Sequence, residues 1–136
     1  MRSWKTFIFC LIVLAVLCGC SAEKNTQPER RQVEFAVLAA EEIPKELQEV
    51  LEKQKARAMR MTYQDQENLY LIRGYGEQET GGYRILVTEC SEDDENLYFS
   101  TQLQGPENAG EAEKSPSYPY LVAKIEFREK QIRLDE

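Results

Sequence analysis

The sequence contains no histidine among its 136 residues, and this absence excludes several kinds of catalytic site. Neither a Ser-His nor a Cys-His pair can form, and the usual metal ligands are reduced to thiols and carboxylates. Two acids could still act as they do in glycoside hydrolysis, but some close pair is expected by chance among 24 acidic residues. We therefore predict that the protein is not an enzyme and has neither a metal site nor a cofactor.

Basic residues are also scarce relative to acidic ones. The chain has 17 Lys and Arg against 24 Asp and Glu, and its formal net charge is −7. Such a balance disfavours binding to the phosphates of nucleic acid and attraction to anionic lipid. We expect no nucleic-acid partner.

One uncharged apolar run is present, Phe7 to Leu17, and it follows the positive residues Arg2 and Lys5. At about 1.5 Å per residue the run is about half as long as a bilayer core requires, so it predicts a signal peptide rather than a membrane-spanning helix. Leu17-Cys18-Gly19-Cys20 resembles a bacterial lipobox. We predict a lipoprotein signal peptide over residues 1–19 and lipidation of Cys20, with an ordinary secretory signal as the alternative.

These features predict where the protein acts. Two acyl chains on Cys20 would anchor it to a membrane surface outside the cytoplasm. Loss of residues 1–19 would change the net charge from −7 to −9, because it removes two basic residues and no acidic one. Residues 20–32 comprise the lipidated cysteine and a polar segment that we interpret as a flexible tether. Residues 33–136 are predicted to form a single domain.

Only one of the four cysteines, Cys90, follows Cys20. No intramolecular disulfide can therefore stabilise the predicted domain, and its stability must come from packing. Near the end of a strand, Cys90 is expected to be a small buried hydrophobic residue. A reactive thiol or an intermolecular link is the alternative.

Glycine is sparse except in one stretch, where Gly74, Gly76, Gly81 and Gly82 account for four of the seven. They lie between the apolar runs 69–72 and 83–87. Glycine permits positive φ and close backbone approach, so the cluster predicts a strand-turn-strand unit. We expect a hairpin at the centre of a sheet, with positive φ at Gly81 or Gly82 if the turn demands it.

The fold expected from periodicity is α+β. Apolar residues at helical spacing predict one N-terminal helix over Ile43 to Ala56, with Pro44 in its first turn. We expect the helix to pack on one mainly antiparallel sheet of about six or seven strands. The predicted strands are 33–38, 58–63, 68–75, 83–90, 96–104, 121–128 and a last short strand containing Ile132 and Leu134.

Three polar segments between the strands are interpreted as turns or loops. Asp65 to Glu67 and Ser91 to Glu95 are acidic turns that lack the ligand spacing of a calcium loop. Gly105 to Ser117 is a long polar segment, which predicts an exposed loop of the kind that often carries binding function.

From Gly76 onward, four features follow one another in the sequence: Gly76 itself, a Thr-Gly-Gly-Tyr run that opens a strand, a proline-containing loop and a Tyr-Pro-Tyr run. In this order they resemble the PrcB-like domain. That family is named for an accessory lipoprotein of a bacterial surface protease complex. The resemblance covers mainly residues 68–136. The matching residues are Gly76, Thr80, Gly81, Gly82, Tyr83, Ile85, Val87, Pro106, Tyr118, Pro119, Tyr120, Val122 and Ile125.

The resemblance implies an extracytoplasmic lipoprotein that associates with a partner such as a peptidase, and it brings no catalytic residues. We expect a non-catalytic interaction domain that binds an envelope protein, for example as an accessory subunit of a protease complex. A peptidase inhibitor or a small-ligand-binding lipoprotein is the alternative. The candidate partner-binding residues are Thr80, Gly81, Gly82, Tyr83, Tyr118 and Tyr120.

Overall fold

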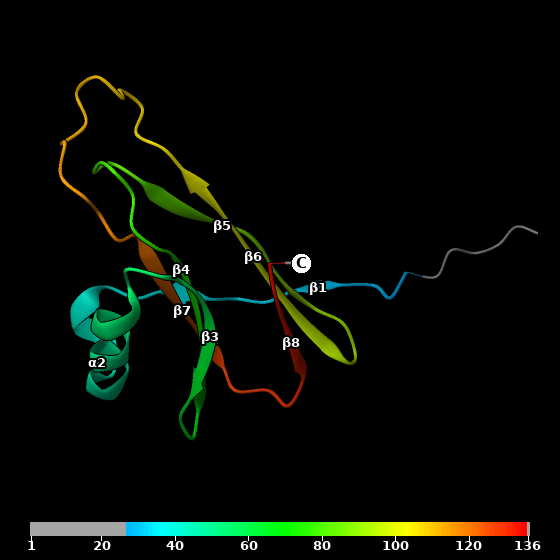
Figure 1. Ribbon diagram of the computed structural model, residues 1–136. Coiled ribbons are helices and arrows are strands. Elements are labelled where there is room, and N and C mark those ends of the chain that lie inside the picture. The colour runs from blue at the N-terminus through cyan, green and yellow to red at the C-terminus, as the bar shows by residue number, and fades with distance from the viewer. Residues whose placement is uncertain (1–26, 136) are drawn as a thin grey trace, which may run out of the picture.

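The computed structural model describes residues 27–135, which form two four-stranded β-sheets with one α-helix against the outer face of one of them (Figure 1). The predicted signal peptide and Cys20 lie outside the described residues. In chain order the elements are β1 (Arg31–Gln32), β2 (Ala36–Val37), the 3₁₀ helix η1 (Ala40–Glu42), α2 (Lys45–Gln54), β3 (Ala58–Gln64), β4 (Asn68–Tyr75), β5 (Arg84–Glu92), β6 (Asn96–Gln104), β7 (Tyr120–Glu126) and β8 (Gln131–Leu134).

Each sheet is built around one hairpin. Sheet A has the strand order β1-β5-β6-β8, and sheet B has the order β2-β7-β4-β3. The β5–β6 hairpin lies in sheet A and the β3–β4 hairpin lies in sheet B. All neighbouring strands are antiparallel except β8, which runs parallel to β6.

The predicted fold class, a single α+β sheet of six or seven strands, is therefore wrong. The described chain is mostly β, with eight strands divided between two sheets. The error came from the glycine-rich stretch, which does not form a hairpin. Strand β4 has β3 and β7 as its neighbours, whereas β5 has β1 and β6, so the glycines join two strands that belong to different sheets.

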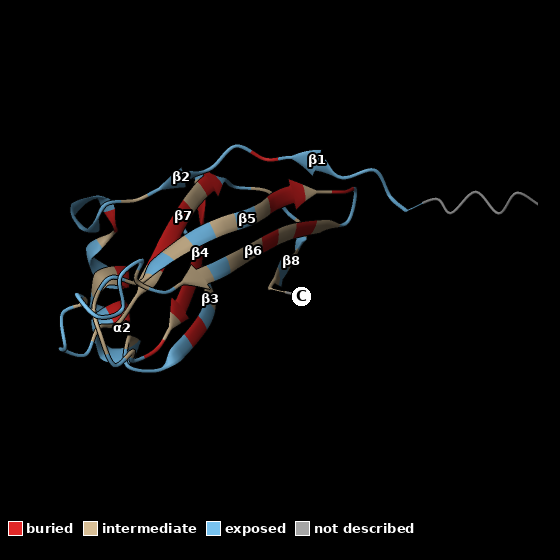
Figure 2. Ribbon diagram, turned by 90° about the horizontal axis from the view of Figure 1, so that it is seen from above, coloured by how far each residue is buried: buried red, intermediate tan, exposed pale blue. Residues whose placement is uncertain are grey.

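Strand β4 shows why two layers cover sheet B. Successive side chains of a strand point to opposite faces. Leu69 and Leu71 accordingly lie between the sheets, whereas Tyr70 and Ile72 pack towards the helix. Figure 2 shows β7 buried along most of its length, whereas β5 has several exposed positions and the buried positions of β6 alternate with partly exposed ones. Burial on both faces identifies sheet B as the middle layer of three.

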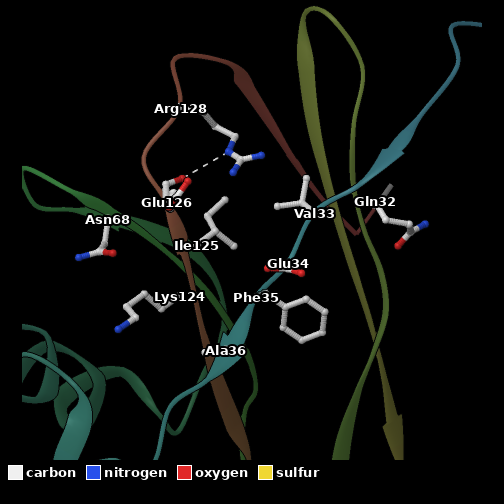
Figure 3. Close-up of a pocket in the computed structure, with 10 residues that line it drawn as sticks. All are labelled: Gln32, Val33, Glu34, Phe35, Ala36, Asn68, Lys124, Ile125, Glu126 and Arg128. Atoms are coloured by element: carbon white, nitrogen blue, oxygen red, sulfur yellow. Dashed lines mark hydrogen bonds between the residues drawn. The ribbon is translucent and has the colours of Figure 1, made fainter.

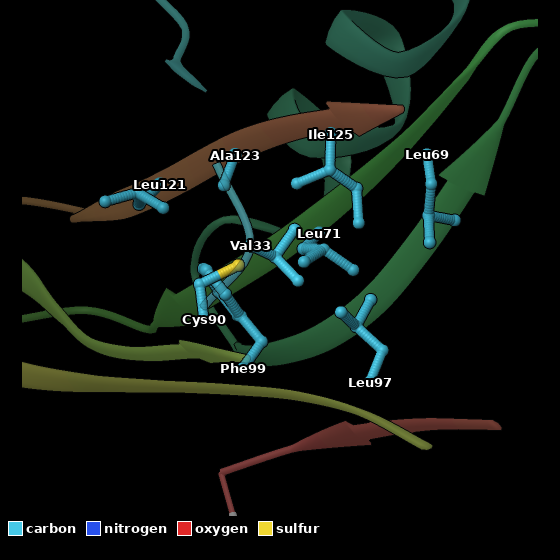
Figure 4. Close-up of a cluster of buried hydrophobic side chains, with 9 residues drawn as sticks. All are labelled: Val33, Leu69, Leu71, Cys90, Leu97, Phe99, Leu121, Ala123 and Ile125. Atoms are coloured by element: carbon cyan, nitrogen blue, oxygen red, sulfur yellow. The ribbon is translucent and has the colours of Figure 1, made fainter. Parts of the chain in front are cut away.

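The core between the sheets is a cluster of apolar side chains contributed by both of them (Figure 4). Leu71, Leu97 and Ala123 are fully buried in it. Such packing stabilises by removing roughly 25 cal/mol per Å² of apolar surface from water. The buried members are Val33, Leu69, Leu71, Cys90, Leu97, Phe99, Leu121, Ala123 and Ile125.

The predicted helix is confirmed with slightly shorter bounds. Pro44 is its N-cap residue rather than part of its first turn, and the helix ends at Gln54. Ile43, Leu47 and Leu51 bury the apolar stripe against sheet B, where they meet Ile72 and Val122.

The segment expected to be one strand over residues 33–38 is divided between the two sheets. At its start, Val33 continues from β1 and its amide donates to the Cys90 carbonyl of β5, whereas its later part, β2, pairs with β7. Val33 enters the core, but Phe35 and Val37 stay 41% and 52% exposed, so the three do not share one buried face. We call residues 31–38 the strap, because they cross from the edge of sheet A to the edge of sheet B.

Candidate functional site

The glycine-rich segment and the long polar loop are tied together into one unit. The amide of Gly81 donates to the Glu113 carbonyl at 3.0 Å, and Gln78 and Ser117 exchange two backbone hydrogen bonds. The Ser117 hydroxyl also donates to the Thr80 carbonyl at 2.6 Å. The Gly81 amide is therefore occupied within the chain and is not free to receive a partner's carboxylate.

Gly82 is required by both conformation and space. Its φ is +83°, in the region that side chains other than glycine rarely adopt, so the expectation of positive φ at this turn is confirmed. A Cβ atom at this position would lie 2.9 Å from the Cβ of Pro106. The segment can therefore lie against the loop only with glycine at position 82.

Two of the candidate tyrosines, Tyr83 and Tyr120, line the same groove between the sheets. The groove has a volume of about 500 Å³. It lies beside the glycine-rich segment, where β5 begins and β7 begins. Its lining residues are Val37, Leu38, Ala40, Ile43, Tyr83, Arg84, Ile85, Leu86, Pro119, Tyr120, Leu121 and Val122. We call it the inter-sheet groove.

The third tyrosine, Tyr118, does not line this groove. Its hydroxyl donates to the Glu77 carboxylate at 3.2 Å, and its ring lies 5.6 Å from the Lys55 ammonium near the end of the helix. The Glu77 hydrogen bond raises the pKa of Tyr118 above its ordinary value. The structure thus brings together Tyr83 and Tyr120, and places Thr80, Gly81, Gly82 and Tyr118 around them.

Within the part of the chain that the structure describes, Arg84 is the single charged residue that lines the inter-sheet groove. Its guanidinium donates to the Glu107 carboxylate at 2.9 Å, and both side chains are largely exposed. An exposed pair of this kind contributes about 0–1 kcal/mol and exchanges partners readily. In an acidic protein, the groove therefore presents apolar surface with one accessible cation.

A second hollow, of about 510 Å³, lies between the strap and the end of β7 (Figure 3). Of its charged lining residues, Arg128 is held within the chain: it donates to the Glu126 carbonyl at 3.3 Å and pairs with Glu92 at 2.7 Å. None of the six predicted partner-binding residues lines this hollow, so it is a weaker candidate than the inter-sheet groove.

Cys90 lies in the core between the sheets and is 3% exposed. Burial raises the pKa of its thiol to about 11, which keeps it protonated at neutral pH. The prediction of a small buried hydrophobic residue is confirmed.

One buried polar cluster joins β4 to the chain after β8. Arg73 donates to the Asp135 carboxylate and, at 3.2 Å, to the Met59 carbonyl. Asp135 in turn accepts from the Thr101 amide at 2.6 Å, and Thr101 shares a hydrogen bond with the Tyr75 hydroxyl. The cluster links the two sheets on the side away from the strap, and its satisfied hydrogen bonds identify it as structural.

The titratable groups of the described part show no arrangement for metal chemistry. Over residues 27–135, no group of three or more His, Cys, Asp or Glu side chains is placed to hold a metal ion. Every buried side-chain nitrogen and oxygen in this range has a hydrogen-bond partner. In the same range, no helix is long and apolar enough to cross a membrane.

Several lining residues of the groove were not predicted as site residues, among them Val37, Leu86 and Pro119. Leu86 carried a usable signal. It is an apolar residue between Ile85 and Val87, whose side chains pack against the core, so its own side chain must leave the core face. An apolar residue on the outer face of a strand is a candidate contact residue.

The fold and the groove define a class, a small two-sheet β domain with an apolar groove between the two sheets. Residues 69–126 match the family model described as PrcB C-terminal, so the predicted resemblance to that family is confirmed over this range. Eight of the twelve residues that line the inter-sheet groove fall within it. No curated protein and no solved structure matches the chain.

Proposed function

We propose that this protein is a non-catalytic, lipid-anchored domain on the outer side of a cell membrane that binds a protein partner of the envelope. The observation that carries the proposal is the inter-sheet groove, whose two tyrosines and apolar lining lie mainly in the range that matches the PrcB C-terminal family. Tyrosine is enriched among the residues that dominate binding energy at interfaces. The role of an accessory subunit of a protease complex agrees with both features.

The direction of the chain supports an outward-facing groove. The first described residues leave the molecule at one end, and the glycine-rich segment and the long loop lie at the opposite end in both ribbon views (Figures 1 and 2). With Cys20 lipidated, the groove would lie at the end of the domain that points away from the bilayer.

Site-specific photocrosslinking in intact cells tests the proposal. A photoreactive phenylalanine analogue at Tyr83 or Tyr120 of the full chain should capture an envelope protein. The same analogue at Thr62, an exposed residue of β3, is the matched control. Capture of the same species at Thr62, or of none at the groove positions, would contradict the proposed function.

The lipid anchor is tested separately. Cys20→Ala should abolish labelling by a fatty-acid analogue and release the protein from the membrane fraction. Labelling that persists in this variant would exclude lipidation at Cys20 and leave the binding proposal intact.

Two other functions remain open for the same groove, a peptidase inhibitor and a carrier of a small ligand. If the captured partner is a peptidase, titration with the purified full chain separates the cases. An accessory subunit should raise or sustain the peptidase activity, and an inhibitor should lower it. A small-ligand carrier should leave the activity unchanged.

A further inference from the structure

Strand β5 has an open edge along most of its length. On one side it pairs with β6 from Arg84 to Glu92, but on the other side β1 pairs only with Ser91 and Glu92. No strand among residues 27–135 pairs with that other side over Arg84–Glu89. Alternate backbone groups of a strand point to each side, so this stretch offers backbone donors and acceptors to an incoming chain.

The strap shows how an extended segment fits the gap between the sheets. At its β5 end, the Val33 amide donates to the Cys90 carbonyl at 2.9 Å. At its β7 end, the Leu38 amide donates to the Val122 carbonyl at 2.9 Å. The strap therefore bridges the two edges by backbone hydrogen bonds, and it fills only part of the gap. The remainder is the inter-sheet groove, which is lined by Arg84, Ile85 and Leu86 of the open edge.

We propose that the groove receives an extended segment of the partner protein, which adds to sheet A as a strand beside Arg84–Glu89. This inference rests on the proposed function and names its mode of binding. In strand addition, backbone hydrogen bonds supply affinity and pockets for alternate side chains supply specificity. Here the groove continues the surface that the strap already covers.

The charge of the groove defines the chemistry of that segment. Among residues 27–135, no acidic residue lines the groove, and Arg84 is the one charged residue that does. The complementary segment has apolar residues at alternate positions and a carboxylate that reaches Arg84. That carboxylate would replace Glu107, whose side chain is 81% exposed and whose loss from the pair costs little.

Strands β3 and β8 also end their sheets, but neither edge belongs to the inter-sheet groove. Strand β8 is only four residues long. Short edge strands resist pairing with another chain. Strand β3 is longer, with seven residues. Of these three edges, only that of β5 lies beside the groove.

Selection of peptides tests the mode of binding without knowledge of the partner. Random nonapeptides displayed on phage are selected against the purified full chain in detergent. Enriched peptides should alternate apolar residues and carry an acid. Amide hydrogen exchange in the presence of a synthetic copy should then slow within residues 84–89.

The matched variants are Leu86→Lys and Phe127→Lys, because Leu86 and Phe127 are 41% and 42% exposed in the free protein. Leu86 lines the groove at the open edge of β5, so a lysine at position 86 places a charge beside the added strand and should weaken the selected peptide about tenfold or more. A lysine at position 127, outside the groove, should leave the affinity unchanged. Equal affinity of both variants would overturn the proposal.

Other outcomes also decide against it. Protection along β3 or β8, or selection without enrichment, contradicts strand addition at β5. If exchange at residues 84–89 slows in the absence of peptide as the protein concentration is raised, the occupant of the groove is a second copy of the chain. If photocrosslinking captures a partner but residues 84–89 stay unprotected in the complex, the proposed function stands and this inference alone fails.

Discussion

The β3–β4 hairpin of sheet B and the β5–β6 hairpin of sheet A turn on the same sequence pattern. D-x-E-N-L-Y occurs at residues 65–70 and again at residues 93–98. In each copy one oxygen of the Asp carboxylate accepts the amides two and three residues later, at 2.9 and 2.7 Å. The other oxygen accepts the Tyr hydroxyl, at 2.9 Å in the first copy and 2.8 Å in the second. Local sequence therefore determines the whole turn.

The two copies differ in what covers the tyrosine. Tyr70 is 5% exposed and packs in the cluster beneath the helix, close to Tyr63. Tyr98 lies on the outer face of sheet A, where the Arg30 guanidinium stacks over its ring at 3.6 Å. Sheet B has a helix against its outer face, whereas in the described chain no helix packs on sheet A. The same residue is a core residue in one hairpin and a surface residue in the other.

The difference appears in the titration of the tyrosines. Burial, together with the Asp65 hydrogen bond, raises the pKa of Tyr70 to about 12. For Tyr98 the hydrogen bond to Asp93 is the main cause of a raised pKa, and the Arg30 cation opposes it. The two aspartates shape the turns of the hairpins, in agreement with the interpretation of these segments as turns.

The largest expected effect separates the two tyrosines. Tyr70→Ala opens a cavity beneath the helix and should lower the free energy of unfolding by about 3–5 kcal/mol. Tyr98→Ala removes a half-exposed ring and should cost well under half as much. Urea denaturation of both variants measures the difference.

The leucines of the two copies provide the control for that comparison. Leu69 and Leu97 are both buried between the sheets, so each Leu→Ala change should cost a similar amount, about 2–5 kcal/mol. Equal losses of stability for the two tyrosine variants would contradict the statement that Tyr70 is a core residue and Tyr98 a surface residue. Strongly unequal losses for the two leucine variants would contradict the statement that both leucines are buried alike between the sheets.

A smaller effect is expected in acid. Hydrogen bonds from the Asn96 amide, the Tyr98 hydroxyl and the Glu95 amide lower the pKa of Asp93 from 3.8 to about 2. The ionised carboxylate therefore stabilises the fold above about pH 4, and this stabilisation is lost as the pH falls towards 2. Asp93→Asn should make the protein less stable at neutral pH and its stability less dependent on pH in this window.

Thermal unfolding between pH 2 and pH 7 measures the Asp93 effect. Asp94→Asn is the matched control, because this neighbouring carboxyl in the same turn is 94% exposed. A wild-type pH profile that Asp93→Asn leaves unchanged would refute the role given to this carboxylate.

The smallest effect on stability is expected from the arginine that stacks on the Tyr98 ring. Arg30→Ala removes the stacked guanidinium and an exposed ion pair with Glu89 at 2.7 Å. Exposed pairs contribute little, so Tm should fall by about 2 °C or less, and salt should reduce the difference. Arg60→Ala, at an exposed position of β3, serves as the control. If Arg30→Ala lowered the stability as much as Tyr70→Ala, Arg30 would contribute as much to the β5–β6 hairpin as packing against the helix contributes to the β3–β4 hairpin.

The sequence predicted most of the individual elements. Strand ranges 68–75 and 96–104 agree with β4 and β6. The alternation of Leu121, Ala123 and Ile125 correctly identified the face of β7 that packs between the sheets, although Val122 on the other face is buried as well. Each of these elements depends on side-chain periodicity and on turn chemistry within a few residues. The repeated hexapeptide stands in the sequence, but the predictions did not use it.

Strand pairing across the molecule could not be predicted in the same way. Asn68 lies opposite Glu126, and no local pattern indicates that β7 returns to β4 and leaves β5 for another sheet. The glycine-rich segment was correctly identified as a special backbone, but the same glycines fit a hairpin or a connection between sheets. Of the candidate site residues, the structure brings Tyr83 and Tyr120 into one groove, and the binding role of the whole set stays a prediction.

The amino-acid order alone determined the strands, the helix, the two aspartate turns and the scarcity of catalytic side chains, because each follows from residue types and near neighbours. The tertiary structure decided that the strands form two sheets, that one tyrosine of a repeated pair is buried, and that β5 keeps an open edge beside an apolar groove. Those outcomes depend on contacts between segments far apart in the chain, whose free energies compete and cannot be ranked from local sequence.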